Sequence, residues 1–263
     1  MPACCFGRWL LRDRHAPDAV VLGDLGWRPW STIARERAVA LCSRISSRIS
    51  CRPSALVGEL SRASLHGWAH AVCETLADAG IAPPSVPADW PQTTLDRQLF
   101  IRERVRPAFT RADHELWRQH VSAYRDAGIQ LYASLVETPV LAPVHTAACP
   151  PRYAAAWCRM RHGGSTLASH RSSRHQGADA CRLCGSADTS TLHALLACPA
   201  LLSSRQRWWQ RVRALCPVRV TSPSEGGEEL VRWFFSARLP AAAAAANATF
   251  AYRVECAFGD GHA

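Results

Sequence analysis

The sequence predicts a mostly α-helical protein: a helical bundle-like body with a small Cys3His zinc knuckle and C-terminal helices. Apolar side chains recur at helical spacing, as Ala38, Cys42 and Ile49 do. Capping residues, glycine and proline frame these segments. We find no convincing alternation of apolar and polar residues that would indicate strands. With 263 residues and 48% hydrophobic content, the chain is long enough to bury a core.

The first predicted region, residues 1–137, is helical. Residues 1–30 are expected to be irregular, with Trp27 and Trp30 as anchors in a core. A helix follows from Ser31 to about Ile49, and its predicted inner face includes Leu41. Three further helices are predicted: one over about 54–79 that ends at Gly80, one from Thr93 with Asp96 as capping partner that ends at Pro107, and one from Thr110 and Asp113 to Gly128.

The second predicted region, residues 138–215, begins in a proline-rich stretch at 137–151 and is strongly basic. From Thr138 to Ala178 it contains no acidic residue. It does contain five arginines: Arg152, Arg159, Arg161, Arg171 and Arg174. A short helix is expected at about 151–161, followed by a basic loop, which is a plausible phosphate-binding surface. The alternative is a flexible linker that happens to be basic.

The chemically most specific feature is the C-x2-C-x8-H-x4-C pattern of Cys181, Cys184, His193 and Cys198. Two thiolates from a tight turn, an imidazole and a third thiolate can complete a tetrahedral zinc shell. Gly185 supplies the permissive backbone that such a knuckle needs. The segment before Pro199 reads as a short helix. Because residues five apart lie about 140° apart around an ideal helix, we expect Cys198 to ligate from a frayed helix end.

The region after the knuckle is predicted to be helical as well. A helix over 201–215 should turn Trp208, Val212 and Leu215 inward, with several arginines around it. Trp208 and Trp209 could offer a stacking face for a base, but core packing is the simpler interpretation. The third predicted region, residues 216–263, contains two helices, at Glu228–Ala237 and Ala241–Phe258.

The charge of the chain favours a polyanionic partner. The formal net charge is +10, and all 31 basic side chains are arginine. Arginine suits bidentate phosphate contacts, although a coding bias could also explain the absence of lysine. On the helix from Ser31, Arg37, Arg44 and Arg48 lie close together beside the apolar face. This arginine stripe could follow a phosphate backbone, or it could be an ordinary solvated face.

Cysteine usage and the absence of targeting signals bear on the compartment. Twelve cysteines would suit a secreted disulfide scaffold only in a much shorter chain with a signal peptide, and no adequate apolar leader is present. No run approaches the roughly 18 apolar residues of a membrane span. We therefore expect a reduced, intracellular protein, located in the nucleus, in which the cysteines outside the knuckle are buried small hydrophobes.

The knuckle, read as Cys181-Arg-Leu-Cys-Gly followed by Leu192-His-Ala-Leu-Leu-Ala-Cys-Pro, resembles the zinc knuckle near the C-terminus of non-LTR (LINE-type) retrotransposon reverse transcriptases. Three other segments fit this resemblance in order, and together they span about residues 15–215: Leu22–Trp27, which resembles the "GELGW" segment beyond the polymerase palm, Trp117–Leu135 after the thumb, and Trp157–Gly163, which resembles the "LRLG" segment. The resemblance implies that residues 1–137 are thumb-like or connecting, that RNA or DNA is the partner, and that an upstream polymerase domain belongs to the parent protein.

The chemistry of a polymerase is absent from the sequence. A palm needs paired carboxylates to hold two divalent ions, and no adjacent Asp-Asp pair or strand-rich palm is present. We therefore expect no catalytic residues and no enzymatic activity in this chain, which would begin after the palm. Two alternatives remain open: a zinc-stabilised protein-interaction module, and a decayed retroelement reading frame without function.

Overall fold

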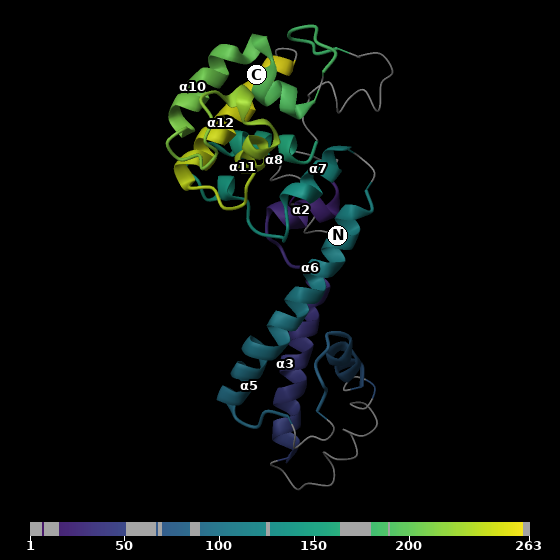
Figure 1. Cartoon of the computed structure of the whole chain (residues 1–263). Coiled ribbons are helices and arrows are strands. Elements are labelled where there is room, and N and C mark those ends of the chain that lie inside the picture. The colour runs from purple at the N-terminus through teal and green to yellow at the C-terminus, as the bar shows by residue number, and fades with distance from the viewer. Residues whose placement is uncertain are drawn as a thin grey trace. The chain divides into compact units, whose positions relative to one another are not determined.

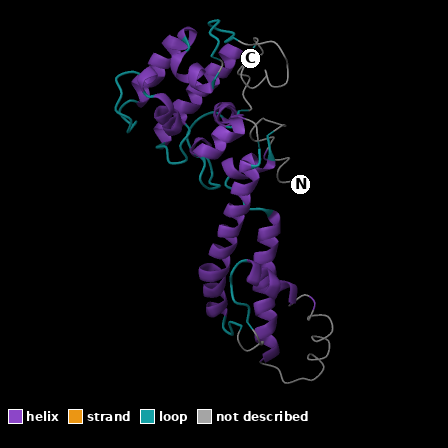
Figure 2. Ribbon diagram, turned by 45° about the vertical axis from the view of Figure 1, so that its right-hand side comes forward, coloured by secondary structure: helices purple, strands orange, loops and turns teal. Residues whose placement is uncertain are grey.

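The structure is a computed structural model that describes Gly7, Gly67 and residues 16–50, 70–84, 90–124, 127–163, 180–188 and 190–259. Helices dominate these residues, as predicted, and no strand occurs among them (Figure 2). One isolated antiparallel bridge joins Leu25 to Leu141.

The chain divides into two compact units. Unit 2 comprises Arg28–Leu116, and unit 1 comprises Met1–Trp27 together with Trp117–Ala263. This division differs from the three predicted regions, which placed a boundary at 137–151. The reason is that the core of unit 1 joins residues on both sides of that stretch, such as Val21 and Trp157, to residues within it, such as Val144.

Unit 2 contains α3 (Trp30–Ser50), a helix over 70–78, α5 (Thr94–Phe100), the π-helical turn η2 (Ile101–Val105) and the first part of α6 (Arg106–Ser122) (Figure 1). The core residues are Val39, Cys42, Val72, Leu76, Ile81, Trp90, Val105, Ala108 and Phe109. The predicted caps are present: the Thr93 side chain accepts a hydrogen bond from the Asp96 backbone, and Gly80 has φ +72° after its helix. Residues 51–66, predicted to begin the second helix, lie outside the described residues.

Several predictions for unit 2 and for the bounds of α6 are wrong. Trp30 is 66% exposed and Leu41 is exposed, so neither is a core residue. Pro107 does not end a helix, because α5 continues through η2 into α6. In η2 the backbone N–H of Arg106 donates to the carbonyl of Ile101, five residues earlier. This wider turn opens the backbone just before Pro107, whose ring would otherwise meet a carbonyl of the preceding turn. Correspondingly, Thr110 lies inside α6, and α6 ends at Ser122 rather than Gly128.

Unit 1 contains α2 (Asp18–Asp24), α7 (Ala127–Leu135), η3 (Pro143–His145), α8 (Pro151–Arg161), η4 (His193–Ala197), η5 (Pro199–Leu201), α10 (Leu202–Val212), η6 (Pro223–Glu225), α11 (Gly227–Phe234) and α12 (Ala241–Phe258). α12 packs along α8 and α10. Buried alanines on both helices, such as Ala155 and Ala244, let α8 and α12 approach closely.

The aromatic core of unit 1 fixes α8, α10, α11 and α12 to one another. Trp208 stacks on Phe250 with ring centroids 5.0 Å apart, and its Nε1 donates to Asn247 Oδ1 at 2.8 Å. Asn247 Nδ2 and Trp157 Nε1 both donate to the carbonyl of Phe234, at 3.0 Å each. These contacts confirm the core interpretation of Trp208. The predicted inward Leu215 is instead 39% exposed, because α10 ends at Val212.

Candidate metal centre

The first half of the candidate site is a tight loop that carries Cys181 and Cys184. The backbone N–H of Gly185 donates to the carbonyl of Cys181 at 2.7 Å, and the N–H of Cys181 donates to the carbonyl of Ser186 at 2.6 Å. Gly185 has φ +74°, a conformation that costs other residues strain. The loop therefore needs glycine at this position, as the sequence predicts, and it brings the two thiols to one side.

The second half is η4, the π-helical turn His193–Ala197, which ends at Cys198. The backbone N–H of Cys198 donates to the carbonyl of His193 at 2.7 Å. An α-helix would direct side chains five residues apart in different directions, but the i→i+5 bond takes one more residue into the turn. His193 and Cys198 consequently face the same point, from a wide turn rather than from a frayed end.

The structure brings all four predicted ligands together. Their donor atoms, three Sγ atoms and one imidazole nitrogen, all lie within 4.8 Å of one another. The Sγ atoms of Cys181 and Cys198 are 3.9 Å apart, and Cys184 Sγ is 3.3 Å from His193 Nε2. Cys181, His193 and Cys198 are buried, and Cys184 is half-buried. The four residues could hold one metal ion through these atoms.

The surroundings of Cys181 and Cys198 shift the pKa values of the two thiols in opposite directions. Burial raises the pKa of the Cys198 thiol to about 11. Burial also opposes ionisation of Cys181, but hydrogen bonds from the backbone of Leu183 and Cys184 and from neighbouring thiols lower the pKa of Cys181 below its ordinary value. A bound cation would favour the thiolate form of every cysteine in the cluster.

A polar loop lies beside His193 and bonds to its backbone. Asp188 Oδ1 accepts a hydrogen bond from the Ser190 backbone at 2.8 Å, and Ser190 Oγ accepts one from the His193 backbone at 3.0 Å. Asp188 Oδ2 lies 4.0 Å from His193 Nδ1, which is too long for a hydrogen bond. This carboxylate faces Nδ1, while Nε2 faces Cys184 Sγ; a metal-bound histidine usually has a polar partner on the ring nitrogen that does not bind the metal.

Arg205 on α10 binds the backbone of the segment that carries His193 and Cys198. Its side chain is buried, and it donates from Nε to the carbonyl of Leu195 at 2.8 Å and from Nη2 to the carbonyl of Cys198 at 2.5 Å. The carbonyl of Leu195 lacks its α-helical donor because residue 199 is a proline without an N–H. The sequence pattern places Arg205 among the surface arginines of this helix. The sequence contains one indication that Arg205 points inward: Trp208, which is predicted to be a core residue, lies one turn further along the same face of the helix.

The predicted nucleic-acid-binding arginines have different environments. Arg37 and Arg44 are exposed on α3. The side chain of Arg48 lies outside the described residues, and so do Arg171 and Arg174. Arg159 forms a bidentate ion pair with Glu255, with an Nε–Oε1 distance of 3.1 Å.

The prediction for Arg161 is wrong, because its side chain is 1% exposed and cannot reach a phosphate. Arg161 donates to Asp24 Oδ1 at 2.8 Å, and Asp24 is completely buried. The guanidinium carbon of Arg161 lies 5.4 Å from the ring centre of Tyr132 and 5.0 Å from that of Trp157. Arg161, which the sequence predicts to lie on the surface, is therefore a buried cation packed against α7 and α2.

Segments far apart in the sequence meet around this ion pair. Trp117 Nε1 donates to the carbonyl of Ala19 at 2.7 Å, and the rings of Trp117 and Tyr132 pack edge to face. A Cβ at Gly23 would collide with the Tyr132 hydroxyl, so the close approach requires glycine. Residues from the segments 22–27, 117–135 and 157–163 therefore meet in unit 1, through the contacts of Asp24 and Tyr132 with Arg161 and of Trp117 with Tyr132.

A second cysteine–histidine contact lies in the same core. Cys158 Sγ is 3.5 Å from His145 Nε2. Burial raises the pKa of Cys158 well above its ordinary value, and burial lowers the pKa of His145. Both shifts favour the neutral forms, so this pair lacks the features of an activated nucleophile.

The remaining cysteines follow the predicted burial in part. None of the described cysteines is in a disulfide; Cys42 and Cys158 are buried, whereas Cys256 is exposed.

In the part of the chain that the structure describes, no helix has the length and apolar character needed to cross a membrane. Comparisons with protein-family models, with curated proteins and with solved structures found no match for this chain.

Proposed function

We propose that this chain is a zinc-stabilised, nucleic-acid-binding segment of the kind found beyond the palm of non-LTR reverse transcriptases. The observation that carries the proposal is the Cys3His cluster. Zn–S bonds of about 2.3 Å and Zn–N bonds of about 2.0 Å in a tetrahedron separate the donor atoms by roughly 3.5–3.8 Å. The 3.9 Å and 3.3 Å contacts in the structure are close to this spacing. Three thiolates and one imidazole are a donor set that zinc prefers to magnesium or calcium.

The role of the zinc would be structural. Four protein ligands leave no open coordination position at which a water could be activated. The ion would tie the 181–185 loop to η4, which packs against α10 and α12. In small zinc modules, metal binding contributes about 10 kcal/mol or more to the stability of the folded segment.

The nucleic-acid part of the proposal rests on charge. The chain has a formal net charge of +10, and the stretch from 138 to 178 has no acidic residue. Because Arg159 and Arg161 are engaged in ion pairs, Arg171 and Arg174 are the better candidates in that stretch, with Arg37, Arg44 and Arg48 on α3 as a second set. Phosphate contacts of this type position RNA or DNA without reading its bases.

The resemblance assigns polymerase chemistry to a separate upstream domain, and we propose no catalytic role for this chain. The proposal keeps the nucleus as the expected location, and any polymerase activity would belong to the upstream domain. The alternative function is a protein-interaction module in which the zinc centre is a rigid corner between helices.

Salt-dependent binding of a labelled single-stranded RNA and a labelled DNA duplex to the full chain tests the proposal. Each phosphate contact changes the slope of log K against log salt by about 0.7–0.9. Replacing Arg171 and Arg174 by alanine should flatten the slope by up to about 2, equally for all sequences. The control is Arg219→Ala with Arg238→Ala, which removes the same charge from exposed positions.

Zinc content has to be measured in each variant, because loss of the zinc centre would imitate loss of contacts. Unchanged affinity and slope in zinc-loaded Arg171→Ala/Arg174→Ala protein would show that these residues do not contact nucleic acid. Absence of binding by the wild-type protein at low salt would refute nucleic-acid binding altogether and favour the interaction module.

A further inference from the structure

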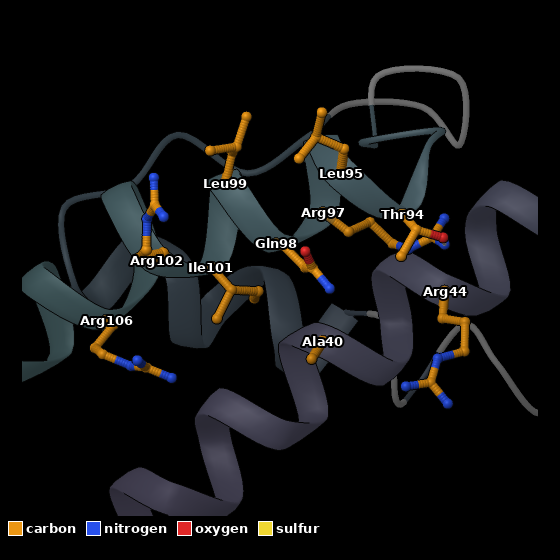
Figure 3. Close-up of a pocket in the computed structure, with 10 residues that line it drawn as sticks. All are labelled: Ala40, Arg44, Thr94, Leu95, Arg97, Gln98, Leu99, Ile101, Arg102 and Arg106. Carbon is orange, nitrogen blue, oxygen red and sulfur yellow. The ribbon is translucent and has the colours of Figure 1, made fainter.

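Unit 2 contains an arginine-lined groove that is separate from the zinc ligands, which all belong to unit 1. The groove has a volume of about 720 Å³ and lies between α3 and the continuous α5–η2–α6 helix (Figure 3). The arginines of the groove are Arg44, Arg97, Arg102 and Arg106. Ala40, a small side chain on α3, leaves room between the helices, and Gln98 and Ile101 point toward α3 in Figure 3.

The lining of the groove is cationic, since it includes four arginines and no acidic side chain among the described residues. The side chains of Arg102 and Arg106 are 68% and 56% exposed, and Arg44 is exposed as well. Arg102 pairs with Glu103 at 2.7 Å, an exposed contact of the kind that contributes little and exchanges readily.

Two of the arginines are held in place by the protein. Arg97 donates to the carbonyl of Gln92 and to Thr94 Oγ1, both neutral acceptors, at 2.9 Å each. Arg106 donates from Nε and Nη2 to one oxygen of Glu36, at 3.0 Å and 2.7 Å. Fixed side chains of this type lose less conformational entropy when a ligand binds.

Two exposed arginines of α3, Arg37 and Arg44, lie on the face of the helix that borders the groove. Arg37, Ala40 and Arg44 lie three and four residues apart, which places them on one face of the helix. Arg37 is exposed, like Arg44. Of the stripe that the sequence indicates on α3, Arg44 lines the groove together with Arg97, Arg102 and Arg106 of the α5–η2–α6 helix, a second set that the sequence pattern did not indicate.

We propose that this groove binds the phosphodiester backbone of a single-stranded polynucleotide. Figure 3 shows the guanidinium groups of Arg44, Arg102 and Arg106 well apart: Arg106 points toward α3, Arg102 points to the side away from α3, and the three do not converge on one point. Such a distribution fits the successive phosphates of a strand better than one small anion.

The inference rests on the nucleic-acid binding proposed above, but it assigns the contact to residues outside the basic stretch and the zinc centre. The test uses the full zinc-loaded chain and a fluorescein-labelled oligo(dT), with affinities measured over a range of salt concentrations. The variant is Arg44→Gln with Arg102→Gln. The matched control is Arg35→Gln with Arg104→Gln, because Arg35 lies about 180° from Arg44 around α3 and neither Arg35 nor Arg104 lines the groove.

For a single strand, loss of two phosphate contacts should reduce the salt slope by about 1.4, which corresponds to about 25-fold weaker binding at 0.1 M salt. The control should bind as the wild type does, or with a small, unspecific loss. All four side chains are exposed, so thermal unfolding should change little in either variant, although the control also removes Arg104 from above the Phe100 ring, 5.8 Å from its centre.

Each other outcome refutes a different statement. If wild-type protein binds oligo(dT) but the groove variant and the control are equally affected, the groove is not the site, and the proposed function survives. If wild-type protein does not bind, both proposals fail. If labelled polyglutamate binds as tightly as oligo(dT) and depends on the same two arginines, the groove serves an acidic protein segment, and the polynucleotide assignment is wrong.

Discussion

The backbone N–H of Cys198 donates to the carbonyl of His193, five residues earlier, at a distance of 2.7 Å. The bond creates the π-helical turn that lets both side chains face one point. The same arrangement occurs in η2, where Arg106 donates to Ile101 and Pro107 follows, as Pro199 follows Cys198. In both turns the proline removes a backbone donor, and the wider turn accommodates its ring.

We predict one zinc ion per chain. Native mass spectrometry of the purified protein should show this stoichiometry, and Cys184→Ser should lose the zinc because one thiolate is missing from a closed four-ligand shell. Cys256→Ser, at an exposed cysteine outside the cluster, is the control and should keep the metal. Full zinc content in Cys184→Ser would mean that the ligand assignment is wrong.

Gly185→Ala should weaken zinc binding by about 5- to 30-fold, since a left-handed backbone costs an alanine about 1–2 kcal/mol. Gly80 has nearly the same φ, and at both glycines an added Cβ would meet no atom within 4 Å. Gly80→Ala should therefore lose similar stability without any change in zinc affinity. Competition with a chelator measures the affinities, and equal zinc binding by both variants would argue against the loop geometry.

Arg205→Met should destabilise the zinc-loaded protein by about 2–4 kcal/mol, because it leaves two buried carbonyl groups without this donor. It also removes a positive charge beside a centre that carries about one net negative charge when zinc is bound to three thiolates. Arg205→Lys should recover part of the loss. Arg207→Met, at an exposed position of the same helix, should change stability by less than about 0.5 kcal/mol. Denaturant unfolding measures both effects, and an equal cost for Arg205→Met and Arg207→Met would contradict the role of Arg205.

Arg161→Met should cost about 3–5 kcal/mol of unfolding free energy, since it leaves Asp24 as an unpaired charge in the core. Arg102→Met breaks an exposed pair and should cost less than about 1 kcal/mol. The double replacement of Asp24 and Arg161 by Leu and Met should recover much of the loss, which a double-mutant cycle would measure. A cost below about 1 kcal/mol for Arg161→Met would show that the pair contributes little.

The isolated chain should not extend a primed RNA template, because its sequence has no paired carboxylates of the kind that hold two metal ions. Incorporation of labelled nucleotides above a protein-free blank, lost after heat treatment of the protein, would contradict this prediction.

Features that depend on a residue's own chemistry or on its near neighbours could be predicted from the sequence. The ligand spacing identified Cys181, Cys184, His193 and Cys198, and the knuckle predicted a glycine with a permissive backbone at 185, where φ is positive. The Thr93 cap and the start of α8 at Pro151 also depend only on local backbone donors and acceptors.

The burial of particular cations and the form of the π-helical turns became evident only in the folded chain. In the sequence, Arg161 and Arg205 cannot be told apart from the exposed arginines. Arg161 is buried because Asp24 accepts its hydrogen bond in the core. Arg205 is buried because the carbonyl groups of Leu195 and Cys198 accept its hydrogen bonds. Trp30 has a large apolar side chain of the kind that usually packs in a core, yet it is exposed. Burial depends on which helices pack together, and this packing is set by contacts between residues far apart in the chain.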